Sequence, residues 1–157
     1  MTDFEIGFEK KDINILKSLI DNGTNINAKL IHRSNPLIMA CQYGHLVILN
    51  FLIDNGININ DVDNIGNSAF TTACQYGQID CVKKLYKNNA HINHVNNAGT
   101  TALIFACLYG HVDCVKFLLE KGAYIDVVNK NGLTALNSSN EKEIQNLLLS
   151  YKLLQNY

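Results

Sequence analysis

One pentapeptide recurs in this chain at a constant interval. ACQYG occupies residues 40–44 and again 73–77, and ACLYG occupies 106–110, so each start follows the last by 33 residues (73 − 40 and 106 − 73). An enzyme has one active site and no need to repeat a pentapeptide, whereas a stack of equivalent units repeats each of its corners. The interval therefore predicts a repeat protein.

The best preserved unit, residues 96–126, predicts two short helices joined by a tight corner. Thr101 is a natural N-cap, because its hydroxyl can accept a free amide of the first turn. Apolar residues at helical spacing follow Gly110, and Gly122 ends the second helical segment. The predicted elements are a turn at 97–99, a helix over 102–109, a second helix over 112–120 and an extended arm over 123–126.

A helix pair this short cannot bury its apolar face alone, so it must stack on its neighbours. The expected organisation is one domain, residues 1–157, made of five units. The units are an N-terminal cap repeat over 1–29, full repeats over 30–62, 63–95 and 96–128, and a shortened C-terminal cap repeat over 129–157.

These units resemble the ankyrin repeats over nearly the whole chain. The family pattern D-x-x-G-x-T-P-L-H-x-A-A-x-x-G-H is matched by DNIGNSAFTTACQYGQ (63–78), NNAGTTALIFACLYGH (96–111) and NPLIMACQYGH (35–45). The resemblance implies an all-α solenoid of stacked helix-turn-helix units with hairpin fingers. It also implies a non-enzymatic protein–protein interaction module that needs no cofactor.

The chain departs from the family pattern at several positions. Arg33 replaces a turn glycine and predicts an irregular first finger, whereas Asn89 replaces a helix-ending glycine, which is tolerable because Asn visits the left-handed region. The last unit is about four residues short between its helices. The T-P-L-H histidine is replaced by Ile38, Thr71, Ile104 and Asn137, so its side-chain hydrogen bond should be lost or altered.

Candidate chemistry in the sequence has a structural interpretation in each case. The five cysteines recur with the repeat, as Cys41, Cys74 and Cys107 and as Cys81 and Cys114, which predicts small buried side chains and no disulfides. His45, Gln78 and His111 share one position, and replacement of His by Gln there favours a hydrogen-bonding role between loops over general-base chemistry. His91 and His94 could suggest a metal, but residues i and i+3 of an extended arm point to opposite faces.

The resemblance places partner binding on the hairpin tips and the exposed side of the first helices, together a concave palm. Tyr43, Tyr76 and Tyr109 would form a ladder there, and tyrosine serves interfaces well, although it could equally suit this corner for packing. The predicted partner-binding residues are His32, Arg33, Gln42, Tyr43, Asn64, Ile65, Asn67, Gln75, Tyr76, Asn97, Ala98, Thr100, Leu108, Tyr109, Lys130 and Asn131.

Two alternatives from other classes stay open at this stage. Proteins resembling this one can be substrates of an asparaginyl hydroxylase acting on an Asn of the hairpin arm, a place that Asn27, Asn60 and Asn93 occupy here. The chain could also be a structural or scaffold unit. An added oxygen on Asn60 or Asn93 in a mass spectrum would favour the substrate interpretation.

The charge of the chain bears on the class of partner that it can bind. The formal net charge is −1 with no run of like charges, which argues against nucleic acid and anionic membranes. The first residues lack the pattern of a signal peptide, and no apolar stretch approaches the roughly 20 residues that cross a bilayer, so a cytoplasmic location is expected, including a host-cell cytoplasm for a pathogen or viral protein.

The C-terminal segment carries two apolar faces. Ile144, Leu147, Leu148, Tyr151 and Leu154 fall on one helical stripe and should seal the last repeat. Leu149 and Leu153 lie on nearly the opposite side, where a capping helix ought to be polar. The protein is expected to be monomeric, with weak self-association through Leu149 and Leu153 as the alternative to two ordinary exposed leucines.

Overall fold

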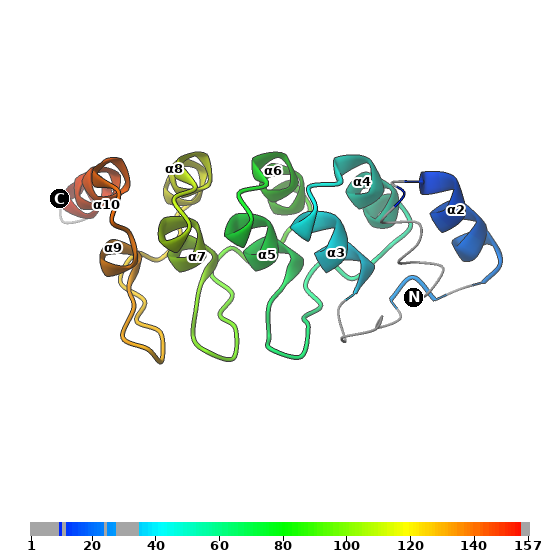
Figure 1. The fold of residues 1–157 in the computed structure, drawn as a ribbon, viewed down its shortest axis with the longest axis horizontal. Helices are drawn as coiled ribbons and strands as arrows, with labels where there is room; N and C mark the ends of the chain where they lie inside the picture. Colours follow the sequence, from blue (N-terminus) through cyan, green and yellow to red (C-terminus); the bar gives the residue numbers. More distant parts are fainter. Residues whose placement is uncertain (1–9, 11, 24, 28–34, 155–157) are drawn as a thin grey trace.

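A computed structural model describes residues 10, 12–23, 25–27 and 35–154. A helix α2 (Ile13–Asp21) is followed by four helix pairs that stack side by side, so that first helices form one row and second helices another (Figure 1). The pairs are α3 (Pro36–Gln42) with α4 (Leu46–Asp54), α5 (Ala69–Gln75) with α6 (Ile79–Lys87), α7 (Ala102–Leu108) with α8 (Val112–Glu120), and α9 (Ala135–Ser138) with α10 (Lys142–Leu154). The expected all-α solenoid is confirmed.

Extended fingers connect the pairs and project from the row of first helices (Figure 1). Within the described residues they form only isolated antiparallel bridges, Val62 with Ser68 and Val95 with Thr101. The arms are tied to one another by asparagine side chains. Asn60 Oδ1 accepts from the His91 amide at 3.0 Å, and Asn93 Oδ1 accepts from the Tyr124 amide at 2.9 Å. Each arm thereby fixes the spacing of the next repeat.

Each first helix begins at a capping side chain. In each case the side chain of the N-cap residue accepts a hydrogen bond from the backbone amide three residues further along the chain. The N-cap residues are Asn35, Ser68, Thr101 and Thr134. In two repeats the bond is reciprocated, because the Thr71 hydroxyl accepts from the Ser68 amide at 2.9 Å and the Asn137 side chain accepts from the Thr134 amide at 2.7 Å. Thr71 and Asn137 therefore supply a bond at the position of the family histidine, and isoleucine at the other two positions has no polar atom to do so.

The recurring pentapeptide is the end of each first helix. In the ACLYG copy, the Cys107 carbonyl accepts from the Gly110 amide, and the Ala106 carbonyl accepts from the His111 amide at 2.9 Å. Gly110 has φ +74°, which is the left-handed conformation of a Schellman corner. ACQYG is repeated because this corner is repeated, and Tyr109 stands at its C-cap.

The core runs continuously between the two rows of helices. Small side chains at Ala73, Cys74, Ala106 and Cys107 are fully or almost fully buried where neighbouring first helices pack together. All five cysteines are buried free thiols, as predicted. Burial raises the pKa of the Cys107 thiol to about 12, so it remains protonated and unreactive at neutral pH.

The terminal and irregular units match their predictions in part. Asn89 adopts φ 63°, which confirms that it replaces the helix-ending glycine in left-handed geometry. Helix α9 has only four residues, against seven in α3, α5 and α7. The prediction that Leu154 helps to seal the last repeat is wrong. Leu154 lies on the stripe but is 73% exposed, because it lies in the extra turn of α10, beyond the point where the second helices of the other repeats end. The predicted irregular finger around Arg33 lies outside the described residues.

Candidate functional site

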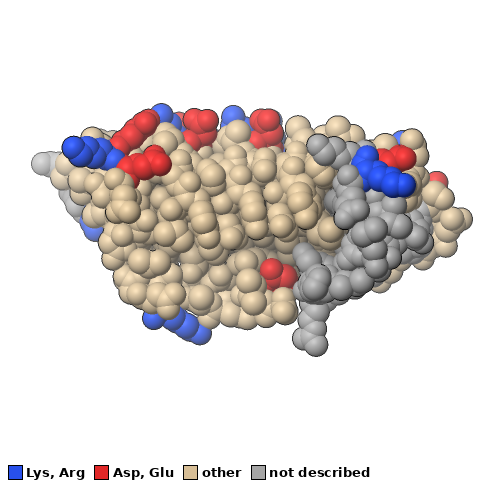
Figure 2. All heavy atoms as spheres, viewed as in Figure 1, with Lys and Arg blue, Asp and Glu red and all other residues tan. Residues whose placement is uncertain are grey.

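The first helices present an almost uncharged surface. Their sequences PLIMACQ, AFTTACQ and ALIFACL contain no Lys, Arg, Asp or Glu, whereas α6 and α8 carry both signs of charge. In the face seen in Figure 2, charged side chains gather over the second helices, and few lie over the first helices and fingers. We call the solvent-facing side chains of the first helices and their corners the palm: Gln42, Tyr43, Gln75, Tyr76, Leu108 and Tyr109.

Three half-exposed tyrosines recur along the palm. Tyr43, Tyr76 and Tyr109 are 56%, 46% and 52% exposed, so each keeps about half of its surface available. Two of them stack on the residue that follows the corner glycine. The Tyr43 ring lies 5.7 Å from the His45 ring at 23°, and the Tyr109 ring lies 6.4 Å from the His111 ring at 24°. Tyr109 also stacks on Phe105 of its own helix, with ring centroids 6.5 Å apart at 19°, and both rings still keep about half of their surface exposed.

A cleft lies between Tyr76 and Tyr109. It has a volume of about 320 Å³ and is lined by Gln75, Tyr76, Tyr109 and His111. His111 is held in place because its Nε2 lies 3.0 Å from the Gln75 carbonyl oxygen of the preceding repeat. This bond matches the hydrogen-bonding role between loops that was predicted for the position shared by His45, Gln78 and His111. The cleft therefore has aromatic walls and a fixed polar edge, which suits an apolar side chain with a polar neighbour.

The predicted tip residues separate into exposed and buried groups. Asn64, Ile65, Asn97, Lys130 and Asn131 are exposed, and Ala98 is half-buried. Asn67 and Thr100 are predicted partner-binding residues, but each is only 6% exposed. The reason is that both accept hydrogen bonds from the next finger, Asn67 from Asn96 at 2.9 Å and Thr100 from Asn129 at 3.0 Å. His32 and Arg33 lie outside the described residues.

Three residues that hold the turns of the fingers were not predicted from the sequence: Asp63, Asn96 and Asn129. Each side-chain oxygen accepts two backbone amides of its own turn; for Asn96 these are Ala98 N at 3.0 Å and Thr100 N at 2.9 Å. Backbone bonds then join neighbouring tips, from Asn97 N to Ile65 O and from Lys130 N to Ala98 O. The 33-residue spacing of these Asp and Asn positions was the available signal. The tips are consequently a connected, preorganised row.

The alternative chemistries find limited support in the geometry. Within the described residues, no three His, Cys, Asp or Glu side chains gather as a metal site. His94 instead lies with Nε2 2.7 Å from the Gly66 carbonyl oxygen of the preceding finger. The Asn60 and Asn93 amides, candidates for hydroxylation, are engaged with the following repeat. Hydroxylation of Asn60 or Asn93 stays the alternative interpretation of these positions. None of the described helices has the length and apolarity required to cross a membrane.

Stacked 33-residue helix pairs, left-handed glycine corners and linked fingers define an α-solenoid repeat protein. The family model described as Ankyrin repeats (3 copies) matches residues 6–96 and 88–156. The chain belongs to the ankyrin-repeat family, whose members generally act as non-enzymatic protein–protein interaction modules. A comparison with curated proteins gave no match.

Proposed function

We propose that this chain is a protein-binding module that holds a partner protein on the palm and the exposed tip residues. The observation that carries the proposal is the uncharged palm with its three half-exposed tyrosines and the cleft between Tyr76 and Tyr109. Tyrosine is among the residue types that contribute most to binding energy in interfaces. The mechanism is recognition by a preformed surface.

Rigidity supports this mechanism. The fingers are connected by backbone and side-chain bonds, and the corner residue His111 is bonded to the preceding repeat. A surface that is ordered before binding loses little conformational entropy when the partner arrives. Because the palm lacks charge, its complement on the partner is also a neutral surface with at least one apolar side chain. Binding should depend only weakly on salt.

Site-specific photo-crosslinking tests the proposal. A photoreactive phenylalanine derivative is introduced at Leu108 on the palm, and at Lys83, an exposed residue of α6, as the matched control. Lysate of the source cells is irradiated with each protein, and crosslinked proteins are identified by mass spectrometry. A protein captured through position 108 and not through 83 is expected, and its capture should disappear in the Tyr76→Ala/Tyr109→Ala background.

The same experiment can contradict the proposal. Equal capture through both positions would place binding outside the palm. Capture through 108 that survives both tyrosine substitutions would show that the tyrosines serve the corner alone. Circular dichroism of the double variant provides the control for folding, and an unchanged spectrum is expected because the rings lie outside the core.

A further inference from the structure

Three asparagines in this chain directly precede a glycine: Asn22, Asn55 and Asn131. An Asn-Gly pair can react with itself, because the glycine amide nitrogen can close a ring on the asparagine side-chain carbonyl carbon, and no Cβ on the glycine hinders the approach. Ring closure requires that the asparagine side chain and the peptide unit behind it can both turn. The hydrogen bonds at each pair therefore decide which asparagine reacts in the folded protein.

The Asn55 pair is held at the end of α4. Asn55 Nδ2 donates to the Phe51 carbonyl at 2.8 Å, and the Gly56 amide donates to the Ile53 carbonyl at 3.0 Å. Ring closure there must break both bonds, and the first of them fixes the side chain itself. Asn22 lies beside residue 24, which is outside the described residues, so Asn55 is the pair used for comparison.

The Asn131 pair lies at the tip of the last finger and is held by fewer bonds. The Gly132 amide donates to the Asn129 carbonyl at 3.0 Å, as the Gly56 amide does to Ile53. Within the described residues, however, neither the side chain nor the carbonyl of Asn131 has a hydrogen-bond partner, and Asn131 and Gly132 are both exposed. One hydrogen bond therefore opposes ring closure at Asn131, where two oppose it at Asn55.

The equivalent position in an earlier finger is fixed by the finger that follows. Ile65 precedes Asn131 by two repeats, and its carbonyl accepts from the Asn97 amide at 3.0 Å. A Cβ built on Gly66 would lie 2.8 Å from that same Asn97 nitrogen, whereas a Cβ built on Gly132 would meet nothing within 4 Å. Within the described residues no finger follows the last one (Figure 1). The peptide unit of Asn131 can therefore turn, because no neighbouring finger holds it.

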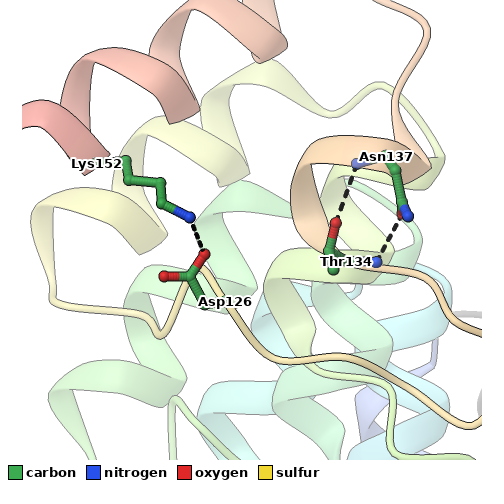
Figure 3. A network of polar contacts seen from close by, with 4 residues as sticks. All are labelled: Asp126, Thr134, Asn137 and Lys152. Carbon is green, nitrogen blue, oxygen red and sulfur yellow. Dashed lines mark hydrogen bonds and ion pairs between the residues drawn. The ribbon is translucent and has the colours of Figure 1, made fainter.

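The turn is anchored on both sides of this residue. Asn137, which closes the N-cap of α9 with Thr134 (Figure 3), also donates from Nδ2 to the Gly132 carbonyl at 3.1 Å. On the other side, the Lys130 amide donates to the Ala98 carbonyl at 2.9 Å. The motion that ring closure requires is thus confined to the single residue between these anchors, and it needs no unfolding of the repeat.

We propose that Asn131 is a site of spontaneous deamidation in the folded protein, through attack of the Gly132 amide nitrogen on the Asn131 side chain. The Gly132 nitrogen loses its proton to water or hydroxide and bonds to Cγ of Asn131. The bond from Cγ to Nδ2 then breaks, and ammonia leaves with a proton returned by the solvent. The product is a cyclic imide.

Water opens the imide in one of two ways. Cleavage of the new bond at Cγ gives aspartate, and cleavage at the backbone carbonyl gives isoaspartate, which predominates in an unconstrained imide. Overall, one water is consumed, one ammonia is released, and nothing is oxidised or reduced. The exposed row of tip residues gains a carboxylate that the sequence does not encode.

Peptide mapping of the full folded chain, incubated at neutral pH, tests the proposal. Asn131 should convert roughly fivefold faster than Asn55, because one additional hydrogen bond slows a reaction that must break it by about that factor. In urea, where neither site keeps its bonds, the two asparagines should convert at similar rates. Isoaspartate should exceed aspartate at position 131. Asn131→Gln should abolish the acidic form at this site, because the larger ring of glutamine closes far more slowly.

Ile65→Asn provides the matched control for the missing finger. It creates the same dipeptide at an exposed tip position whose carbonyl is held by Asn97. In the folded variant, position 65 should convert roughly fivefold more slowly than Asn131. Circular dichroism should show an unchanged fold, because Ile65 is 54% exposed and lies outside the core.

Three results would overturn the proposal. Conversion at Asn131 that is absent, or no faster than at Asn55 in the folded chain, would mean that the tip is held as firmly as the end of α4. Equal conversion at position 65 of the Ile65→Asn variant would mean that a following finger gives no protection. Aspartate without isoaspartate at position 131 would indicate direct hydrolysis by water in place of attack by Gly132.

Discussion

The corner between the two helices of a repeat can be tested by comparing two glycines that share a backbone conformation and differ in their surroundings. Gly77 has φ +68°, and a Cβ built there would lie 2.5 Å from His111 Nδ1 and 2.8 Å from two ring carbons. Gly122 has φ +79°, and a Cβ there would meet nothing within 4 Å. Alanine at either position incurs left-handed strain, but only at Gly77 does it also displace a neighbour.

The magnitudes follow from these two environments. Left-handed strain costs an alanine about 1–2 kcal/mol, so Gly122→Ala should lower the free energy of unfolding by about that amount. Gly77→Ala adds the loss of the bond between His111 and the Gln75 carbonyl, about 0.5–1.5 kcal/mol, and a strained His111 rotamer of similar cost. The expected total at Gly77 is about 2–5 kcal/mol.

Urea unfolding followed by circular dichroism measures both variants. A double-mutant cycle adds His111→Ala and Gly77→Ala/His111→Ala. With the imidazole absent, the cost of Gly77→Ala should fall to that of Gly122→Ala. Equal losses for the two single glycine variants would refute the reasoning, since they would mean that the imidazole moves aside at no cost. A fully additive double variant would lead to the same conclusion.

Three further predictions concern the palm, the core and the arms. Tyr76→Ala with Tyr109→Ala should weaken binding to a palm-crosslinked partner at least tenfold, about 1.4 kcal/mol, with little change in melting temperature; normal binding with early melting would make both tyrosines packing residues. Burial raises the Cys107 pKa from 9.0 to about 12, so its contribution is complete below pH 9 and is lost as pH rises toward 12. Wild type should therefore lose about 1 kcal/mol more than Cys107→Ala between pH 9 and pH 10 in urea titrations, and parallel profiles would contradict this. Intact-peptide mass spectra of protein from its source cells should show no added oxygen on Asn60 or Asn93 while their amides hold the next arm, and an added 16 Da there would favour the hydroxylase-substrate alternative instead.

The fold was predictable because its local signals repeat and agree. The range 112–120 was predicted as a helix and is α8, since Gly110 and Gly122 delimit an apolar pattern with helical spacing. Thr101 caps its helix as expected because capping depends on three neighbouring residues only. Leu154 could not be placed correctly from spacing alone. It lies on the sealing stripe of the helix, but the stack of repeats ends before reaching its turn.

The candidate site was predictable only where exposure follows from sequence position. Asn67 and Thr100 occupy turn positions that read as solvent-facing, yet both are buried by asparagines 29 residues further along the chain. That contact depends on how closely neighbouring fingers approach, which no local pattern encodes. For the same reason the cleft between Tyr76 and Tyr109 emerged only once the repeats were stacked.

The recurrence of tyrosine at the C-cap is the point at which folding and binding explanations separate. The backbone there has φ between −94° and −99°, which any residue adopts, so the Schellman corner requires its glycine but does not require tyrosine. Stacking on a histidine accounts for Tyr43 and Tyr109. It does not account for Tyr76, because the residue after its corner is Gln78, which has no ring. Tyr76 is thus required neither by the corner backbone nor by stacking on a histidine, and it lines the cleft. This supports the proposal that the palm binds a partner.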